Sequence, residues 1–485
     1  MRRDLFIHFK KYLILPTVFI FLYGCGEREH NILPLANAGT NQVIDIGKNV
    51  TLNGSGFDID GQIISFQWRQ IAGPEVILSN DDSQKPSFIA PKVTENKTLI
   101  FELTVTDDKG ASRRDQVEVI INRLLFADAL TRILDDNFRH CVSAGRSEVY
   151  ADEIIDINFC WYQGIQSIEG IENFTSLRSL VLVGNKLTSV DLSALTNLIY
   201  LNVANNQLTE LNVSTNTKLE LIHAFTNALT EIDLSNNVEL QTLDLSKNQL
   251  QSVIIAGADK LNSLKLNNNQ LTSVDISGNI NLKTFYANYN QLTNLDTHNN
   301  INLRWLSLKD NQLNNIDISN NKLVELNLSN NQLSDIDLTG NNFLRNLYIN
   351  NNHLTSIDLI DQAQNLERLY LDSNQLTNVN VSYTPHLEFL YLGNNQITNL
   401  NIDGTPMLRE LWLGHNQLSN VDLTNNPNIV KLYAHDNLLS SVPLGLGNIK
   451  DSNAIIKLNE NTFDEAAIKE LDMLKERYIN LSFTP

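Results

Sequence analysis

A leucine or isoleucine recurs with a mean spacing of 21 residues over more than half of the chain. It stands at positions 177, 198, 219, 240, 261, 282, 303, 323, 344, 366, 387, 408 and 429. A short, fixed period of this kind is typical of a solenoid, in which each repeat forms one coil. One repeat cannot bury its own hydrophobic face, so successive coils must stack on one another. The repeat therefore predicts an elongated, mainly β fold for this part of the chain.

Each repeat has the form LQTLDLSKN, as from Leu240 to Asn248. Side chains alternate along a strand, so Leu243 and Leu245 are expected to point inward, with the residues between them facing solvent. The repeat resembles the leucine-rich repeat, in the short-period bacterial form of surface proteins such as internalins. This resemblance implies a right-handed solenoid with a parallel β-sheet on its concave face and a thin convex side.

An asparagine follows the strand part of every repeat. It occupies positions 185, 206, 227, 248, 269, 290, 311, 331, 352, 374, 395, 416 and 437. A side-chain amide offers both donors and an acceptor, so it can pair backbone groups that a turn into the core would leave buried. We expect this column to be structural.

The first 24 residues have the layout of a secretory signal. Residues 1–11 are basic, and residues 12–23 form an apolar run of twelve before Gly24 and Cys25. Twelve residues are too few to span a hydrocarbon core about 30 Å thick. The segment Leu22–Cys25 resembles the lipobox of bacterial lipoproteins, which implies cleavage at residue 24 and acylation of Cys25. Gly26 is not the aspartate linked to inner-membrane retention, so the resemblance implies an outer-membrane anchor. A plain signal with a chance cysteine is the alternative.

Residues 25–34 are expected to form a tether, and residues 35–122 a β-sandwich. Ile64, Phe66 and Trp68 alternate as in a strand, and turn signals such as Asp60-Gly61 separate the apolar stretches. The segment resembles the polycystic-kidney-disease-like (PKD-like) domains of exported bacterial proteins, which implies an immunoglobulin-like sandwich. Asp58 and Asp60 are too few carboxylates for the six to eight oxygens that calcium takes, so we expect them to cap turns.

Solenoid ends need caps, because a terminal repeat exposes its core. Residues 123–148 have helical spacing and predict an N-terminal cap, residues 149–461 the repeats, and residues 462–485 a C-terminal cap helix and tail. Cys141 and Cys160 are expected to form a disulfide between the first cap and the first coil, because exported proteins meet an oxidising compartment. Two buried thiols are the alternative.

The position between the two strand leucines faces outward and is aromatic in five successive repeats. These residues are Tyr348, Tyr370, Tyr391, Trp412 and Tyr433, which we call the aromatic ladder. Trp305, Phe389 and Tyr289 are expected to widen it from neighbouring columns. The ladder is the predicted ligand-binding platform, with polar contacts from His415, His435 and Asp436, since exposed apolar patches mark interaction sites. Alternatively, the rings only brace the sheet.

Five aspartates fall in register on successive repeats, at positions 275, 296, 317, 337 and 358. Local hydrogen bonding within turns is the expected role of these side chains. Calcium binding along the column is the alternative.

Several functions are disfavoured by composition and motifs. With 36 Lys and Arg against 55 Asp and Glu, the net charge of -19 is unsuited to nucleic acid. The sequence has no phosphate-binding glycine loop, no GxSxG motif and no closely spaced histidine ligands, so we expect no enzyme, no cofactor and no metal.

The sequence thus predicts a lipid-anchored envelope protein that binds a protein or polysaccharide with its concave face, as adhesins do. A structural envelope or matrix protein, with the repeats as spacer and self-association scaffold, is the rival prediction.

Overall fold

The computed structural model describes residues 30–319, 321–359 and 364–484. The chain divides into two compact units, with the boundary in the sequence between Arg123 and Leu124. The predicted signal peptide and Cys25 lie outside the described residues, so their roles stay predictions.

The N-terminal unit is built from antiparallel and mixed β-sheets around one hydrophobic core. Its largest sheet has the strand order β2-β8-β7-β5, and the pairs β1-β4 and β3-β6 complete the unit. The strands are β1 (Leu35–Asn37), β2 (Gln42–Asp45), β3 (Asn49–Thr51), β4 (Ser55–Phe57), β5 (Ile63–Ala72), β6 (Ser87–Ile89), β7 (Lys97–Asp107) and β8 (Ser112–Asn122). Alternate residues of β7 and β8 are buried against Trp68, which is 2% exposed. This confirms the immunoglobulin-like expectation.

One detail of β5 differs from the alternation in the sequence. A β-bulge shifts the register against β7 between Ile63 and Ser65. Because a one-residue shift reverses the face of a side chain, Ile64 is 64% exposed, and Ile63 packs against the core instead. The expectation that Ile64 shares a face with Phe66 and Trp68 was therefore wrong.

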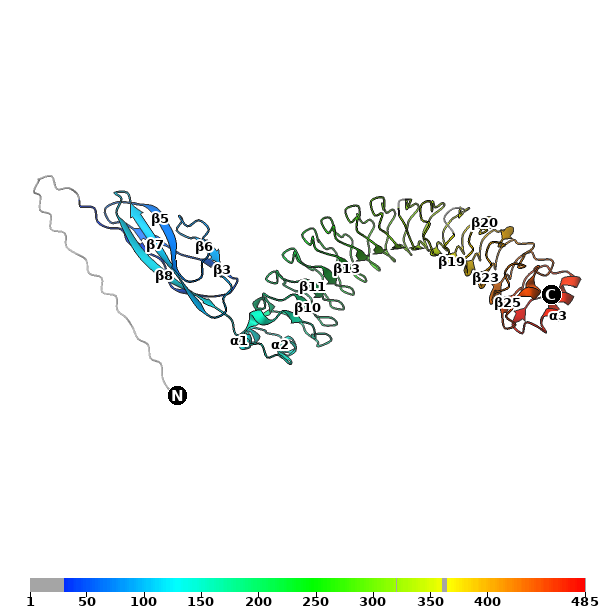
Figure 1. Ribbon diagram of the computed structural model, residues 1–485, viewed down its shortest axis with the longest axis horizontal. Helices are drawn as coiled ribbons and strands as arrows, with labels where there is room; N and C mark the ends of the chain where they lie inside the picture. The colour runs from blue at the N-terminus through cyan, green and yellow to red at the C-terminus, as the bar shows by residue number, and fades with distance from the viewer. Residues whose placement is uncertain (1–29, 320, 360–363, 485) are drawn as a thin grey trace, which may run out of the picture. The chain divides into compact units, whose positions relative to one another are not determined.

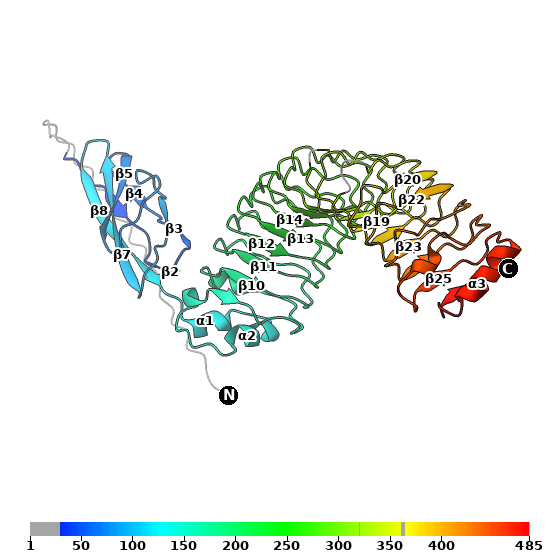
Figure 2. The same cartoon turned by 45° about the vertical axis from the view of Figure 1, so that its right-hand side comes forward.

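The second unit is a curved solenoid whose inner side is lined by one sheet, as Figures 1 and 2 show. Among the described residues this sheet has 16 strands, and all its pairs are parallel. The strands are β9 (Asp156–Ile157), β10 (Ser179–Val181), β11 (Tyr200–Asn202), β12 (Leu221–His223), β13 (Thr242–Asp244), β14 (Ser263–Lys265), β15 (Thr284–Tyr286), β16 (Trp305–Ser307), β17 (Glu325–Asn327), β18 (Asn346–Tyr348), β19 (Arg368–Tyr370), β21 (Phe389–Tyr391), β23 (Glu410–Trp412), β24 (Lys431–Tyr433), β25 (Ile455–Lys457) and β26 (Leu481–Ser482).

The rest of each coil consists mainly of turns. One short pair, β20 (Asn378–Asn380) and β22 (Asn399–Asn401), lies on the outer side of the solenoid (Figure 1). Three-residue 3-10 helices occupy Ala151–Glu153, Ile171–Asn173 and Leu446–Asn448. The convex side of the solenoid is thin because it consists of turns and these short elements.

The asparagine column has the predicted structural role in every described repeat. Asn290 is typical: its Nδ2 donates to Leu266 O at 2.9 Å and Ala287 O at 3.1 Å, and its Oδ1 accepts from Leu271 N at 3.0 Å. The amide thus joins two successive coils through their buried backbone groups. A second buried column escaped the sequence analysis. It includes Asn216, Asn237, Asn279, Asn300, Asn321, Asn341 and Asn426, which bond backbone carbonyls across the outer turns.

Helices lie at both ends of the solenoid. The N-terminal region contains α1 (Phe126–Thr131) and α2 (Asp136–Ser143), and the C-terminal region α3 (Glu465–Leu474). The first two are separate because Asp135 caps α2, with its side chain accepting from Phe138 N at 2.9 Å. Tyr478 is fully buried after α3 and donates its hydroxyl to Leu446 O and Ile449 O.

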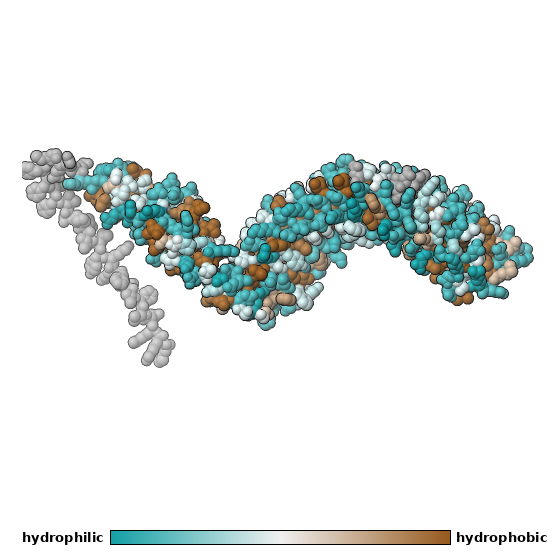
Figure 3. Space-filling view, viewed as in Figure 1, coloured by the Kyte–Doolittle hydropathy of each residue, from teal (hydrophilic) through white to brown (hydrophobic). Residues whose placement is uncertain are grey.

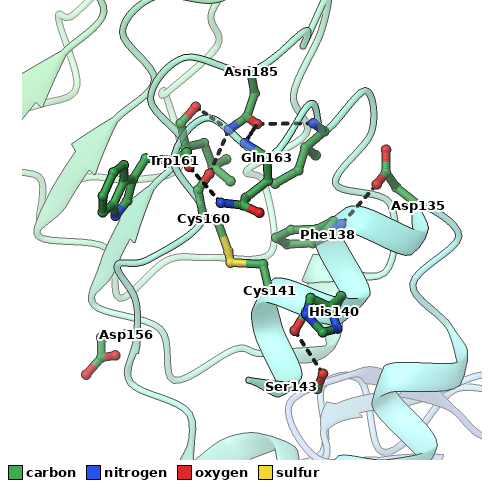
Figure 4. Close-up of a disulfide and its surroundings, with 12 residues drawn as sticks. Asp135, Phe138, His140, Cys141, Ser143, Asp156, Cys160, Trp161, Gln163 and Asn185 are labelled. Atoms are coloured by element: carbon green, nitrogen blue, oxygen red, sulfur yellow. Dashed lines mark hydrogen bonds between the residues drawn. A yellow bond between two sulfur atoms is a disulfide. The ribbon is translucent and has the colours of Figure 1, made fainter. Parts of the chain in front are cut away.

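The predicted disulfide is present between α2 and the first coil (Figure 4). It joins Cys141 to Cys160 with a Cα–Cα distance of 5.4 Å. Asn185 from the next coil holds the same segment, since its Nδ2 donates to Cys160 O at 2.7 Å. The bond therefore ties the N-terminal helices to the point where the repeats begin.

Candidate functional site

Strand register brings the five residues of the aromatic ladder into one line on the inner sheet. Tyr348 pairs with Tyr370, Tyr370 with Tyr391, Tyr391 with Trp412, and Trp412 with Tyr433. The strand residues on either side of this position include the leucines that point into the core, so each ring extends toward the concave surface.

The rings of the ladder stack on one another. The centroid distance is 4.9 Å between Tyr348 and Tyr370 and 4.2 Å between Tyr370 and Tyr391. It is 5.1 Å between Tyr391 and Trp412 and 4.0 Å between Trp412 and Tyr433. The last three pairs lie within 17° of parallel, and all five residues are half-buried. Inner rings therefore cover each other's faces, and the ring edges remain on the concave surface.

Polar groups fix the middle of the ladder. The Tyr391 hydroxyl donates to Glu410 Oε2 at 2.7 Å, and Lys431 Nζ lies 2.9 Å from Glu410 Oε1. Burial and the nearby Glu410 carboxylate raise the pKa of Tyr391 well above its ordinary value. Burial raises the pKa of Glu410, but the hydrogen bonds from Tyr391 and Lys431 outweigh it and hold that pKa below its ordinary value. The platform thus presents a neutral phenol beside an ionised, paired carboxylate.

The three predicted polar contact residues lie together at the C-terminal end of the ladder. His415 Nδ1 lies 2.5 Å from Asp436 Oδ2, and the rings of His415 and His435 meet edge to face at 5.0 Å. His415 and Asp436 occupy the same position of successive coils, where the backbone is left-handed. Burial and neighbouring His415 lower the pKa of His435. The ring of His435 also lies 6.5 Å from Tyr433.

Only one of the three flanking aromatics adjoins the ladder. Phe389 lies on the same strand as Tyr391, with the Arg368 guanidinium 5.0 Å from its ring centroid. Tyr289 and Trp305 are 49% and 40% exposed, but they belong to coils that β17 separates from Tyr348. One strand lies between Trp305 and the ladder and two between the coil of Tyr289 and the ladder, so the widening of the platform by these two residues stays a prediction.

The residue at the ladder position also decides one hydrogen bond to the backbone, which the sequence analysis missed. Where the ladder position is Asn or Asp, its side chain accepts from the N–H two residues later. Asp244 Oδ1 accepts from Ser246 N at 3.1 Å, and Asn327 Oδ1 from Ser329 N at 3.1 Å. Tyr391 has no such acceptor to offer Gly393, whose N–H donates to no described atom. A Cβ at Gly393 would lie 3.3 Å from Gly414 O and would meet no other described atom within 4 Å.

The prediction of local hydrogen bonding within the outer turns is confirmed for four of the five aspartates in the column. Asp275, Asp296, Asp317 and Asp337 each accept from the backbone N–H two residues later, at 2.8–3.0 Å. The side-chain and backbone bonds from Ser277 hold the pKa of Asp275 below its ordinary value. The turns themselves thus account for these four carboxylates.

The two aspartates of the N-terminal unit do not behave as predicted. Asp58 is 8% exposed, and neither of its carboxylate oxygens accepts a hydrogen bond from a described atom. Asp60 instead accepts from Ile32 N at 3.3 Å and pairs with Lys109 Nζ at 2.7 Å, which lowers the pKa of Asp60. Turn capping was therefore the wrong role for both residues.

No three His, Cys, Asp or Glu side chains in the described part of the chain are grouped so as to hold a metal ion. Within the same residues, no helix has the length and apolarity needed to cross a membrane. On the face drawn in Figure 3, hydrophobic residues are scattered among hydrophilic ones along the solenoid.

Family models match both units of the chain. A model described as a PKD domain matches residues 38–121, and a model described as Leucine rich repeat matches residues 364–418. No curated protein is significantly similar to the chain in sequence.

Solved solenoids share the fold of the second unit. The functional domain of InlJ from Listeria monocytogenes is 24% identical, with 73% of this chain and 80% of that chain covered and a TM-score of 0.64. YopM from Yersinia pestis is 23% identical, with 72% and 92% covered and a TM-score of 0.55.

The protein is thus a leucine-rich-repeat solenoid preceded by a PKD-like domain. Among solved structures, its repeats are similar in fold to those of InlJ and YopM.

Proposed function

We propose that the protein is a non-enzymatic, lipid-anchored binding protein of the cell envelope that recognises a macromolecule with its concave face. The aromatic ladder carries this proposal. It occupies only five coils, whereas the same sheet continues for many coils without it. A feature needed to hold the coils together would be needed in all of them. Aromatic side chains that are rigid and partly exposed are the residues that dominate protein interfaces.

The stacking geometry favours a protein partner over a polysaccharide. A sugar ring packs its apolar side onto an aromatic face, but both faces of Tyr391 and Trp412 are covered by neighbouring rings. The Tyr391 hydroxyl already donates to Glu410. The ring edges and the N–H of Gly393, which donates to no described atom, remain for the ligand. Edges and donors of this kind suit backbone carbonyls and side-chain oxygens of a protein surface.

Binding and stability measured on the same variants test the proposal. The soluble fragment from residue 27 onward is first screened on protein and glycan arrays. Trp412→Ala and Tyr391→Ala are then expected to weaken the affinity for the ligand found at least tenfold, since each removes a central ring. Val181→Ala, at the same position of an early coil, is the matched control and is expected to bind normally. Unchanged affinity in both ladder variants would place recognition elsewhere.

The rival role as an envelope scaffold has its own signature. Self-association would make the sedimentation coefficient of the soluble fragment rise with concentration in the absence of any ligand. Loss of this rise in Trp412→Ala would assign the ladder to contacts between copies of the chain. Concentration-independent sedimentation would leave recognition of a different molecule as the function.

The lipid anchor at Cys25 is proposed from its position after the apolar run. Cys25→Ser is expected to move the protein from the outer-membrane fraction to the soluble fraction. An intact mass that shows unmodified Cys25 inside a longer mature chain would contradict the anchor.

A further inference from the structure

The β1-β4 pair of the N-terminal unit carries large apolar side chains on its outward face. Leu35 of β1 lies opposite Phe57 of β4 in the antiparallel register, and the two residues are 64% and 60% exposed. Side chains alternate along both segments, so Leu33 and Ile59 belong to the same face, and they are 51% and 70% exposed. These four residues form what we call the apolar face: Leu33, Leu35, Phe57 and Ile59. Opposite side chains of a strand pair lie about 5 Å apart, so the face is continuous.

The residues between those of the apolar face point the other way. Pro34 and Asp58 are buried, and Ala36 packs against the core of the N-terminal unit. The two segments stay together before β1, since Ile32 N donates to Asp60 Oδ1 at 3.3 Å. The solvent side of an antiparallel pair ordinarily carries polar residues. Here that side is apolar, although each of its residues is more than half exposed among the described residues.

The position of the apolar face in the sequence indicates what covers it. Contiguous exposed apolar residues mark an interaction surface. Leu33 follows Cys25 by eight residues. Eight residues span at most about 30 Å even when fully extended. An acylated Cys25 would therefore keep this face within about 30 Å of the membrane surface.

We propose that the apolar face docks on the membrane that holds Cys25, with its four side chains inserted between the lipid headgroups. This inference rests on the proposed lipid anchor. A short tether converts docking into an intramolecular event with an effective concentration in the mM range, so weak insertion is enough. The net charge of -19 disfavours anionic headgroups, so the attraction comes from burial of apolar side chains.

Docking would give the PKD-like domain a role beyond that of a spacer. The lipid anchor alone leaves the domain free to move on its tether. Contact through Phe57 and Ile59 adds a second attachment, so the domain becomes a base that lies against the membrane. Membrane attachment by two weak contacts together is stronger than by either one.

Flotation of the soluble fragment from residue 27 onward with phosphatidylcholine vesicles tests the proposal. This fragment contains every described residue and lacks Cys25, so its binding does not require acylation. The fragment is expected to float with the vesicles at lipid concentrations in the mM range, which match the effect of the tether. Replacing half of the lipid by phosphatidylglycerol is expected to leave this fraction equal or lower. A fragment that does not float, or that floats only with phosphatidylglycerol, would overturn the proposal.

Paired variants assign the binding to the apolar face. The double variant Phe57→Ser, Ile59→Ser is expected to lower the ratio of bound to free fragment at least tenfold, because two apolar side chains no longer insert. Ile77→Ser, Ile89→Ser is the matched control in the same unit. It changes two isoleucines outside the β1-β4 pair, which are 92% and 62% exposed, and is expected to float like the wild type. Scanning calorimetry checks folding, and Leu35→Ser on the opposite strand repeats the comparison if the double variant has a lower Tm. Wild-type flotation of both Phe57→Ser, Ile59→Ser and Leu35→Ser would overturn the proposal.

Two further measurements separate this proposal from its alternatives. Self-association of the fragment without lipid, abolished in Phe57→Ser, Ile59→Ser, would assign the face to a second copy of the chain and overturn docking. An unmodified Cys25 in the mature protein, together with a fragment that floats, would refute the anchor and uphold the apolar face as a membrane contact. An acylated Cys25 with a fragment that does not float would refute docking alone.

Discussion

Two columns of the same solenoid repeat with the same period but differ in extent and in partners. The asparagine column runs through every described repeat, and each amide bonds a backbone group of a neighbouring coil. The aromatic ladder spans five coils, and its rings contact mainly one another. The first column is required wherever a coil turns into the core. The second is a local addition to a sheet that forms without it.

A residue type can recur along a solenoid for two different physical reasons. A residue present in every coil answers a need of the backbone that every coil shares. A residue type confined to neighbouring coils answers a need that exists at one place on the surface. The two columns should therefore respond differently to substitution, in stability for the asparagines and in binding for the rings.

Asn290→Ala is expected to show the largest loss of stability. The change leaves Leu271 N buried without its partner, which costs about 1–3 kcal/mol. Leu266 O and Ala287 O each lose one bond but keep those from Asn269 and Asn311, and a lost hydrogen bond costs about 0.5–1.5 kcal/mol. We expect a loss of about 4 kcal/mol in total. Urea unfolding followed by circular dichroism measures it.

Asn299→Ala is the matched control, since Asn299 is exposed and makes one long bond of 3.4 Å to Ser277 O. It is expected to cost less than about 0.5 kcal/mol, as surface changes usually do. Equal losses in the two variants would mean that the buried column is not a special requirement of the coil.

Reduction of the Cys141–Cys160 bond is expected to have the next largest effect. The two cysteines are 19 residues apart, and closing a loop of that size stabilises a fold by about 3 kcal/mol. The loss should be confined to the N-terminal end, because coils contact only their neighbours. Hydrogen exchange of residues 126–160, in the wild type and in the double variant Cys141→Ser, Cys160→Ser, measures it. Faster exchange in the ladder coils as well would contradict this locality.

The fold of the solenoid was predictable because its period, its strand alternation and its asparagines all follow from one repeated pattern. Leu243 and Leu245 are buried as the alternation requires. The bulge that exposes Ile64 was not predictable, since a β-bulge depends on the pairing of β5 with β7 and leaves no mark on local alternation.

The candidate site was predictable in part. A constant position within the repeat was enough to align the five rings, but stacking that hides their faces depends on side-chain torsions that spacing does not specify. The pairing of Asn31 with Asp107 joins residues 76 positions apart. Asp60 likewise bonds the distant Ile32 N and Lys109 Nζ, contacts that local turn signals do not specify.

Trp412→Ala is expected to cost less stability than Asn290→Ala, although it removes a larger side chain. Trp412 stacks on Tyr391 and Tyr433, and an aromatic pair contributes about 0.5–1.5 kcal/mol. The expected loss is therefore about 1–3 kcal/mol, measured by urea unfolding beside Val181→Ala. A loss as large as that of Asn290→Ala would show that the ladder braces the sheet as strongly as the asparagine column does.

The smallest expected effect is a pH dependence at the C-terminal end of the ladder. Burial and the nearby His415 lower the pKa of His435 below its ordinary value of 6.5. The unfolded chain therefore takes up a proton at His435 at a higher pH than the folded chain does. Stability contributed by this difference is present above pH 6.5 and is lost as the pH falls toward the folded pKa.

Urea midpoints at about pH 7 and about pH 5 should differ less in His435→Gln than in the wild type. His353→Gln, which changes an exposed histidine on another coil, should retain the wild-type difference. If the urea midpoints of His435→Gln differed between the two pH values as much as those of the wild type, the pKa of His435 would be the same in the folded and unfolded chain. The polar end of the ladder would then be as open to water as the outer turns.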